Sequence, residues 1–486
     1  MLVVSAVGRG VVAVVCLIAA VAAAAVIVFG VPVQGAQSPA PTFNKDVAKI
    51  VFDNCASCHR RGDVAPMSLM SYSEVRPWAR AIKQRVEARE MPPWPADPSV
   101  GRFRNAHALT DAQRALLIAW VDGGAAEGEG SPPRPPRFVD GWTSEMDRPP
   151  DQVIEAPFGA NLPPSGTIPE FKVWSRFEGR DQFLEAIELR PLNRAVMHHA
   201  SVFRARMPPG VGIGSGELWP GGPVLNGVPQ TRGGRPILES SVLSLQPLIF
   251  YVPSGGFLRL PRRVAKRIQA NDFLQWTFHL VTTGKAEPAG ARIGLWFTRT
   301  DPEHEVFTLK VTETVIVDEK EIEQDALGPK FPNIAPNDAD YTVTGLLKVT
   351  EPITLYALWP HMHYRGRDMT FVLVDKNGRE QTLLSVPKYS FAWQFTYQLA
   401  SPMRISAGST IKAIAHYDNS SRNRENPDPN QEVIWGPQAT NEMFDPYIEV
   451  AYDRRTLQSP ECAGAGLRPS EPSDQPGGGL SAPRCR

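Results

Sequence analysis

The segment Cys55–His59, which reads Cys-Ala-Ser-Cys-His, constrains this chain more than any other part of its sequence. Two cysteines two residues apart, followed at once by histidine, form the pattern to which a c-type haem is attached. The two thiols can bond the haem vinyl groups, and the adjacent imidazole can bind the iron. A zinc site would need a second ligand pair nearby, and a redox dithiol would need a βαβ setting. The sequence therefore predicts one covalent haem c on Cys55, Cys58 and His59.

The first 36 residues predict export from the cytoplasm. Arg9 is the only charged residue before a long apolar run, Val11–Phe29, and small residues follow around Gly35 and Ala36. The run is also long enough to span a bilayer if it is not cleaved. Residues 1–36 are thus a signal peptide or an N-terminal membrane anchor. Either alternative places the body of the protein in the periplasm or otherwise outside the cytoplasm.

Length, charge and cysteine content limit the domains and the partners. With 486 residues, the chain is too long for one ordinary domain. Its 51 basic side chains balance its 51 acidic ones, so no net field attracts nucleic acid. Besides the haem pair and Cys16, the chain has Cys462 and Cys485. These two can form a disulfide in an oxidising compartment, or stay unpaired in a flexible tail over residues 459–486.

Residues 40–128 predict a small domain of three short helices. The first helix leads into the haem-attachment segment. Ser73 can cap the second, which carries Trp78 in its apolar stripe. A capping box over Thr110–Gln113 starts the third helix, and Gly123-Gly124 ends it. Three short helices around this attachment pattern resemble a small class I cytochrome c.

A methionine in a loop should supply the sixth iron ligand of such a domain. The candidates are Met67, Met70 and Met91. Met91 precedes Pro92-Pro93 and so resembles the Met-Pro ligand loop of cytochromes c, which favours it over the other two. A thioether ligand stabilises ferrous iron and raises the reduction potential. His107 either competes for the iron or lies on the surface.

Beyond the helical region, the pattern of apolar residues changes to strict alternation. Phe183–Leu189 is one example of period two, and Asn377-Gly378 is a hairpin turn signal. Residues 129–150, which are rich in proline and charge, read as a linker. The remaining length suits two antiparallel sandwiches, residues 151–302 and 303–458. The predicted fold is therefore multidomain: a small all-α domain followed by two all-β sandwiches of jelly-roll type.

Five of the nine histidines fall at predicted strand positions. His361 and His363 are two residues apart, so a strand points both imidazoles to one side. His198 and His199 are adjacent and would face opposite sides of a regular strand. Both can bind one metal only if the backbone is bulged or the strand ends there. His279 lies in an apolar strand. A single histidine at such a position is usually a core or surface residue. The five together indicate metal binding.

The order His-His, His, His-x-His and then Glu442-Met443 resembles the copper type II ascorbate-dependent monooxygenases, which include the peptidylglycine and dopamine enzymes. The resemblance covers roughly residues 151–452, and Arg365-Gly366 after the His-x-His pair is a further anchor. It implies two copper ions, one on each sandwich, each with open coordination. The implied ligands are His198, His199 and His279 for the first copper, and His361, His363 and Met443 for the second. Imidazole suits copper in both oxidation states and a thioether favours Cu(I), whereas zinc sites rarely use methionine.

The resemblance also implies hydroxylation of a substrate C–H bond with O2 at the second copper, while the first supplies the other electron. The haem would relay electrons from an external donor, ascorbate or a redox protein. Trp359 stands where the peptidylglycine enzymes have an arginine that holds the substrate carboxylate, whereas Tyr447 matches a substrate-contacting tyrosine. Asp445 replaces an asparagine. A small-molecule or apolar substrate is therefore expected in place of a peptide carboxylate.

The alternative function is a non-catalytic electron-transfer or copper-binding protein, in which haem and copper only carry electrons. A substrate-shaped apolar pocket beside Met443 would favour the enzyme. A closed copper site without such a pocket would favour the alternative. No ligand role transfers to His416, which is expected to be a core or loop histidine.

Overall fold

The computed structural model describes residues 40–138, 141–143, 145–208, 210–217, 224–230, 244–253, 255–325, 328–436 and 438–453. The predicted signal or anchor (1–36) and the tail (459–486) lie outside these residues, together with Cys16, Cys462 and Cys485. Among the residues described, no helix has the length and apolar character needed to cross a membrane. The described residues from Thr42 onward form one compact unit.

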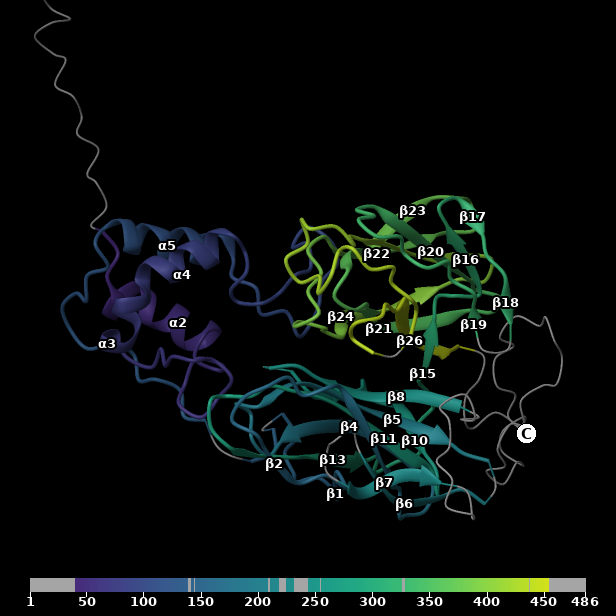
Figure 1. Ribbon diagram of the computed structural model, residues 1–486. Coiled ribbons are helices and arrows are strands. Elements are labelled where there is room, and N and C mark those ends of the chain that lie inside the picture. Colours follow the sequence, from purple (N-terminus) through teal and green to yellow (C-terminus); the bar gives the residue numbers. More distant parts are fainter. Residues whose placement is uncertain are drawn as a thin grey trace, which may run out of the picture. The chain divides into compact units, whose positions relative to one another are not determined.

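Short helices gather in the N-terminal part of this unit (Figure 1). They are η1 (Phe43–Val47), α2 (Ala48–Asn54), α3 (Tyr72–Val75), η2 (Arg76–Trp78), α4 (Ala79–Glu87) and α5 (Asp111–Asp122). Phe43, Leu117 and Trp120 are fully buried at their centre, with the rings of Phe43 and Trp120 6.1 Å apart. These helices therefore enclose a core of their own.

The helix-end signals in the sequence had mixed outcomes. The capping box at α5 is confirmed, because the Thr110 hydroxyl accepts a hydrogen bond from the amide of Gln113 and the Gln113 side chain accepts one from the amide of Thr110. Gly123 caps the other end of α5, and Gly124 follows with a φ of +92°. The predicted Ser73 cap is wrong: the hydroxyl of Ser71 accepts the hydrogen bond at the start of α3.

The prediction that Trp78 belongs to the apolar stripe of the second helix is also wrong. Trp78 is 42% exposed and does not share the apolar stripe of its helix. The segment Arg76–Trp78 is a 3-10 turn that contains Pro77. A proline removes a backbone donor, and three residues per turn shift the phase of the side chains that follow. The tryptophan is therefore turned outward at the junction of α3 and α4.

The first sandwich consists of two packed sheets with the strand orders β1-β13-β4-β10-β14, where β9 also pairs with β4, and β3-β11-β5-β8. The pairs β2–β12 and β6–β7 lie beside them. All pairs are antiparallel except β10–β14. Apolar residues of both sheets meet in one core. The strands are β1 (Gln152–Glu155), β2 (Ala160–Leu162), β3 (Phe171–Arg176), β4 (Gln182–Pro191), β5 (Met197–Arg206), β6 (Gly212–Glu217), β7 (Val224–Gln230), β8 (Ser244–Tyr251), β9 (Phe257–Arg259), β10 (Val264–Ile268), β11 (Phe273–Leu280), β12 (Glu287–Ala289), β13 (Ala291–Phe297) and β14 (His304–Glu305).

The second sandwich packs the sheet β15-β26-β21-β24 against the sheet β17-β16-β20-β25-β22-β23, with the small pair β18–β19 beside them. The predicted turn at Asn377-Gly378 joins β22 to β23, and Gly378 adopts a φ of +81° there. The β-rich antiparallel character expected from the sequence is thus confirmed for the described residues. The strands are β15 (Phe307–Lys310), β16 (Thr314–Val317), β17 (Lys320–Glu321), β18 (Gln324–Asp325), β19 (Gly328–Pro329), β20 (Tyr341–Lys348), β21 (Ile353–His361), β22 (Gly366–Val374), β23 (Glu380–Val386), β24 (Tyr397–Ile405), β25 (Thr410–Tyr417) and β26 (Asp445–Tyr452).

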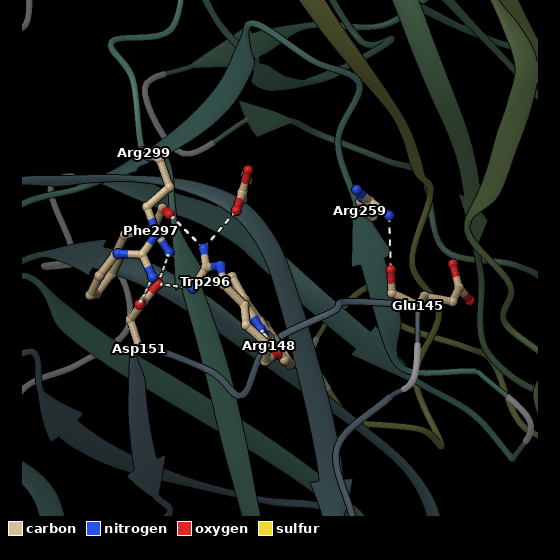
Figure 2. Close-up of polar contacts among 8 residues, drawn as sticks. Glu145, Arg148, Asp151, Arg259, Trp296, Phe297 and Arg299 are labelled. Atoms are coloured by element: carbon tan, nitrogen blue, oxygen red, sulfur yellow. Dashed lines mark hydrogen bonds and ion pairs between the residues drawn. The ribbon is translucent and has the colours of Figure 1, made fainter.

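The second half of the predicted linker is fastened to the first sandwich (Figure 2). The guanidinium of Arg148 lies 2.6 Å from the carboxylates of both Asp151 and Glu185. The indole nitrogen of Trp296 donates to the carbonyl of Arg148. Trp142 and Met146 pack against the Trp296 ring. These residues therefore belong to the surface of the sandwich, and the sandwich begins before residue 151.

The two sandwiches contact each other through buried groups. The ammonium of Lys266 on β10 lies 2.6 Å from the carboxylate of Glu449 on β26, and their side chains are only 5% and 10% exposed. Lys266 also donates to the carbonyl of Pro247. The ring of Phe250 on β8 stacks on Trp359 of β21 with centroids 3.4 Å apart. This interface sets the positions of the histidine clusters described next.

Candidate metal centres

Three histidines of the first sandwich converge on one point. His199 on β5 lies opposite His279 on β11, but Leu280 pairs with Met197, so the register shifts between them. His198 is the extra residue of this bulge. The ligand nitrogens of all three lie within 4.8 Å of one another. Nδ1 of His279 is 3.2 Å from Nδ1 of His198 and 2.9 Å from Nε2 of His199. The bulge that the adjacent pair required is therefore present.

These imidazoles suit a metal because they are neutral. Burial lowers the pKa of His198 and of His199, and it lowers the pKa of His279 to about 4. Neighbouring imidazoles lower the pKa of His199 and His279 further, since each disfavours a second positive charge. A neutral imidazole keeps a nitrogen lone pair for coordination. Three such donors fit copper.

The second cluster lies where strands end. His361 is the last residue of β21, His363 follows in the next turn, and Met443 precedes β26. The two imidazole centroids are 5.2 Å apart. Nδ1 of His361 contacts the side-chain oxygen of Gln394, and Nδ1 of His363 lies 3.2 Å from the carbonyl of Asn441. Because Nδ1 is occupied in each ring, Nε2 is the atom offered to a metal.

Burial keeps this pair neutral as well. It lowers the pKa of His361, and it lowers the pKa of His363 to about 3, with the neighbouring His361 adding to the effect. Met443 contributes a half-buried thioether on the same cavity wall. Two imidazoles and a thioether fit a copper that must be held as Cu(I).

Glu442 braces this cluster, a role that the sequence did not reveal. Its carboxylate accepts hydrogen bonds from the amides of His363 (2.9 Å), Arg365 (2.6 Å) and Met443 (3.2 Å). The residue is fully buried, and burial raises its pKa to about 7 against the opposing effect of these amides. One carboxylate thus ties the His-x-His turn to the methionine. The only signal in the sequence was the glutamate directly before Met443.

A cavity of about 300 Å³ lies between the sandwiches and is lined by both clusters. His199 contributes from the first sandwich, and His361, His363 and Met443 contribute from the second. The largest apolar wall residues are Phe250, Trp359 and Tyr447. Trp359 is stacked between the other two, with centroids 3.4 Å from Phe250 and 4.7 Å from Tyr447. An apolar pocket therefore lies beside Met443.

The polar groups near this wall are paired with each other. The hydroxyl of Tyr447 donates to Asp445 (3.0 Å), and Asp445 lies 2.7 Å from the ammonium of Lys310. Arg365 donates to the carbonyl of Thr440, and Arg367 pairs with Asp340 and Asp368. The cations that could have replaced the missing substrate arginine at Trp359 therefore have partners within the protein.

Phe391 lies between the two clusters. Its ring centroid is 4.9 Å from that of His199 and 5.5 Å from that of His363, and the residue is only 2% exposed. An aromatic ring therefore lies between the two clusters at this point.

The haem-attachment segment follows α2 directly. Cys55 caps that helix, and neither Cys55 nor Cys58 is in a disulfide. Burial raises the pKa of the Cys55 thiol to about 12 and lowers the pKa of His59. Two thiols outside any disulfide, beside a neutral imidazole, match the donor set that a c-type haem uses.

The candidate sixth ligands differ in placement. Met67 packs partly buried against the helical core, and its backbone carbonyl partly offsets the effect of burial on His59. The backbone of Met67 therefore lies next to His59. Met91 is 36% exposed in the loop after α4. Its role as the sixth ligand stays a prediction.

Two other histidines lie apart from the clusters. His416 pairs with Asp368 across 2.6 Å. The ring nitrogens of His107 face the carbonyls of Asn105 (3.2 Å) and Pro93 (2.9 Å), and the residue is half-buried.

Among solved structures, the chain is similar to the infectious bursal disease virus VP2 subviral particle, with 10% identity over 64% of this chain and 74% of that chain and a TM-score of 0.15. It is also similar to a Paenibacillus xanthan lyase, with 9% identity over 66% of this chain and 27% of that chain and a TM-score of 0.16. TM-scores this low do not indicate a shared fold. No curated protein matches the chain.

The second sandwich matches a known family. Residues 330–466 match the model of the copper type II ascorbate-dependent monooxygenase, C-terminal domain. The matched stretch carries His361, His363, Glu442 and Met443. Over residues 330–466 the chain is therefore similar to this family of copper monooxygenases.

Proposed function

We propose that the chain is an exported haem- and copper-containing monooxygenase that hydroxylates a substrate C–H bond with O2. The family match over residues 330–466 supports a copper-dependent, monooxygenase-like function with O2, a substrate and ascorbate as reductant. The observation that carries the proposal is that two donor sets reach one apolar cavity. The set of three imidazoles reaches it through His199, and the set of two imidazoles and a thioether reaches it with all three residues.

The residues around the cavity have separate tasks. Copper at the two clusters supplies O2 binding and one-electron chemistry. Gln394 and Asn441 hold the imidazoles of the second cluster by their Nδ1 atoms, so the rings keep one orientation. Glu442 fixes the backbone on both sides of that cluster. Phe391 and the stacked wall limit access of water to the reacting C–H bond.

The cavity favours an apolar substrate with a flat face. Phe250, Trp359 and Tyr447 offer stacked rings. Lys310 is neutralised by Asp445, and the Tyr447 hydroxyl is committed to the same carboxylate. A substrate carboxylate would therefore find no free cation on this wall. Peptides ending in glycine should be poor substrates.

The helical region would supply the electrons. In this proposal Cys55, Cys58 and His59 hold one haem c, Met91 completes the iron, and an external donor reduces it. The donor is ascorbate or a redox protein. The two thiols, neither of which is in a disulfide, and the neutral His59 support this assignment. Attachment of the haem outside the cytoplasm agrees with the exported location predicted from residues 1–36.

Metal analysis combined with O2 uptake over a panel of substrates tests the proposal. Wild-type protein should carry covalent haem and two copper ions. Met443→Ala should abolish substrate-dependent O2 uptake and keep copper at the three-histidine cluster, whereas His198→Ala should lose that copper. Met403→Ala is the matched control, because Met403 is a partly buried methionine on β24 of the same sandwich.

Two outcomes would contradict the proposal. Protein that purifies with zinc and refuses copper would exclude the monooxygenase. Protein that binds haem and copper but consumes no O2 with any substrate would point to the non-catalytic electron carrier.

A further inference from the structure

The haem-attachment segment is joined to the first sandwich by a network centred on Asp63. One carboxylate oxygen of Asp63 lies 2.7 Å from the guanidinium of Arg60 and 3.3 Å from that of Arg194. The other oxygen accepts from the amide of Val64 at 3.0 Å. The Asp63 side chain is only 7% exposed, so the two guanidinium groups, in place of water, compensate its charge. Removing either cation would leave a nearly buried carboxylate undercompensated.

Both ends of this network lie next to proposed redox sites. Arg194 belongs to the loop between β4 and β5, and its carbonyl accepts from the amide of Met197, the residue before His198. On the other side, the amide of Ala65 bonds the carbonyl of Cys58, which closes the turn that carries Asp63 onto the attachment segment. A single ion pair thus connects the haem motif to the start of the strand with the adjacent histidines.

Tyr251 lies near both the histidine cluster and the Asp63 network. It is the last residue of β8, it pairs with Ala200 next to His199, and it lines the same cavity as His199. The residue is 5% exposed. Burial raises the pKa of its phenol, the charges of Asp63 and Cys58 raise it further, and those of Arg194 and Arg190 lower it, so the phenol is within electrostatic reach of this network.

Gly256 permits this position of the tyrosine ring. It adopts a φ of +94°, and a Cβ there would lie only 2.6 Å from Cδ2 of Tyr251. A larger residue at 256 would push the ring away. The left-handed backbone conformation at Gly256 therefore leaves room for the Tyr251 ring.

The helical region contacts the second sandwich through backbone hydrogen bonds. Residues 97–105 run along it, with the amide of Asp97 bonded to the carbonyl of Ser385 and the amide of Arg104 bonded to the carbonyl of Gln398. These contacts lie some forty residues after the attachment segment in the chain. Among the described residues, the loop that directly follows the attachment segment is joined to the first sandwich by the ion pair between Asp63 and Arg194.

We propose that the Arg60–Asp63–Arg194 network docks the haem against the first sandwich, so that the three-histidine copper is the direct acceptor of its electron. Arg194 and Tyr251 are positioning residues for this transfer, and the inference rests on the proposed function. One electron moves: the iron goes from ferrous to ferric while Cu(II) becomes Cu(I), with no atom or proton transferred. An external one-electron donor such as ascorbate then reduces the iron again.

Flash reduction of the haem in full-length, Cu(II)-loaded protein without O2 tests this inference. The decay of the ferrous haem absorbance reports electron transfer to copper. His198→Ala should remove the fast decay, and Met443→Ala should keep it. Since like charges across a contact oppose docking, Arg194→Glu should slow the decay by about tenfold or more, while Arg194→Lys should restore most of the rate.

Controls separate docking from folding and from the wider proposal. Arg61→Glu makes the same change of charge at an exposed position beside Arg60, on the haem side of the network, and should leave the rate within about twofold, because an exposed charge contributes little. The haem reduction potential and absorbance should match the wild type in each variant. Tyr251→Phe should keep the rate and Tyr251→Leu should lower it.

The failures are distinguishable. An unchanged decay in Arg194→Glu, in protein shown to hold haem and both copper ions, would overturn the docking inference and leave the proposed function standing. Loss of the decay in Met443→Ala with full decay in His198→Ala would also overturn it. Wild-type protein without haem or without copper would overturn the proposed function itself. If Arg194→Glu does not fold, Arg194→Gln removes the cation without repulsion and gives the same comparison.

Discussion

The two histidine clusters offer donors to one cavity, but they are built differently. His198, His199 and His279 stand on hydrogen-bonded strands, and one bulge between β5 and β11 turns them toward a single point. His361 and His363 stand where a strand ends and depend on side chains from elsewhere. The comparison shows two ways to hold a metal: by strand register, or by braces around a turn.

This difference predicts unequal sensitivity to mutation. A register is maintained by many backbone hydrogen bonds, so no single side chain outside the ligands should control the first cluster. The second cluster depends on Glu442, Gln394 and Asn441. Removal of one of these hydrogen-bonding groups should leave the histidine or methionine that it holds free to move.

The largest expected effect is that of Glu442→Ala. Three backbone amides would lose their acceptor inside the protein, which should lower the free energy of unfolding by about 5 kcal/mol. The second copper should be lost and the first retained, so bound copper should fall to half. Copper analysis and thermal unfolding check this. Glu380→Ala, at an exposed glutamate of the same sandwich, should change neither.

Retention of both copper ions in Glu442→Ala would mean that the turn holds its shape without the brace. The contrast between the two clusters would then be wrong.

The next effect concerns the interface that brings the clusters together. Lys266→Met leaves Glu449 buried without its partner and should cost about 3–4 kcal/mol. The double variant Lys266→Met with Glu449→Leu should recover most of this loss, because two apolar residues need no compensation. Lys412→Met, at a more exposed pair, should cost less than 1 kcal/mol. Denaturant unfolding of all three variants decides whether this pair holds the sandwiches together.

The sequence was sufficient where a pattern is complete within a few residues, as in the capping box at Thr110. The ring centroids of His361 and His363 lie 5.2 Å apart, although β21 ends at His361 and His363 lies beyond it. The sequence was insufficient where long-range pairing decides. The bulge at His198 depends on β11, about eighty residues away, and the sequence could state only that one was needed. Local pattern also cannot choose between Ser71 and Ser73, since either could cap a helix.

Contacts made by loops that are distant in the sequence could not be predicted from it either. Phe391 and Gln394 come from the loop between β23 and β24, and nothing in that stretch marks them as neighbours of the histidines. The proline-rich segment before residue 151 reads as a linker because its partners, Trp296 and Glu185, lie in other strands. Such contacts follow from the fold and carry no local signature.

A smaller effect should follow from Phe391→Leu. The change keeps most of the apolar volume and should cost about 1 kcal/mol. Both copper ions should stay bound, but the looser packing between His199 and His363 should admit water, so less product should form per O2 consumed. Product and O2 measured together test this. Phe371→Leu changes a fully buried phenylalanine in the core of the second sandwich and should lower stability similarly without changing that ratio.

Tyr447→Phe should have the smallest effect. The Tyr447 hydroxyl donates to Asp445, which keeps its ion pair with Lys310 when the hydroxyl is removed. Loss of that one hydrogen bond should cost about 1 kcal/mol of stability. The ring still stacks on Trp359, so the KM for an apolar substrate should change less than about threefold. Steady-state kinetics with the best substrate of the panel measure it. A fall in kcat of more than about tenfold would show that the hydroxyl acts on the substrate directly, and that the wall of the second cluster is catalytic as well as apolar.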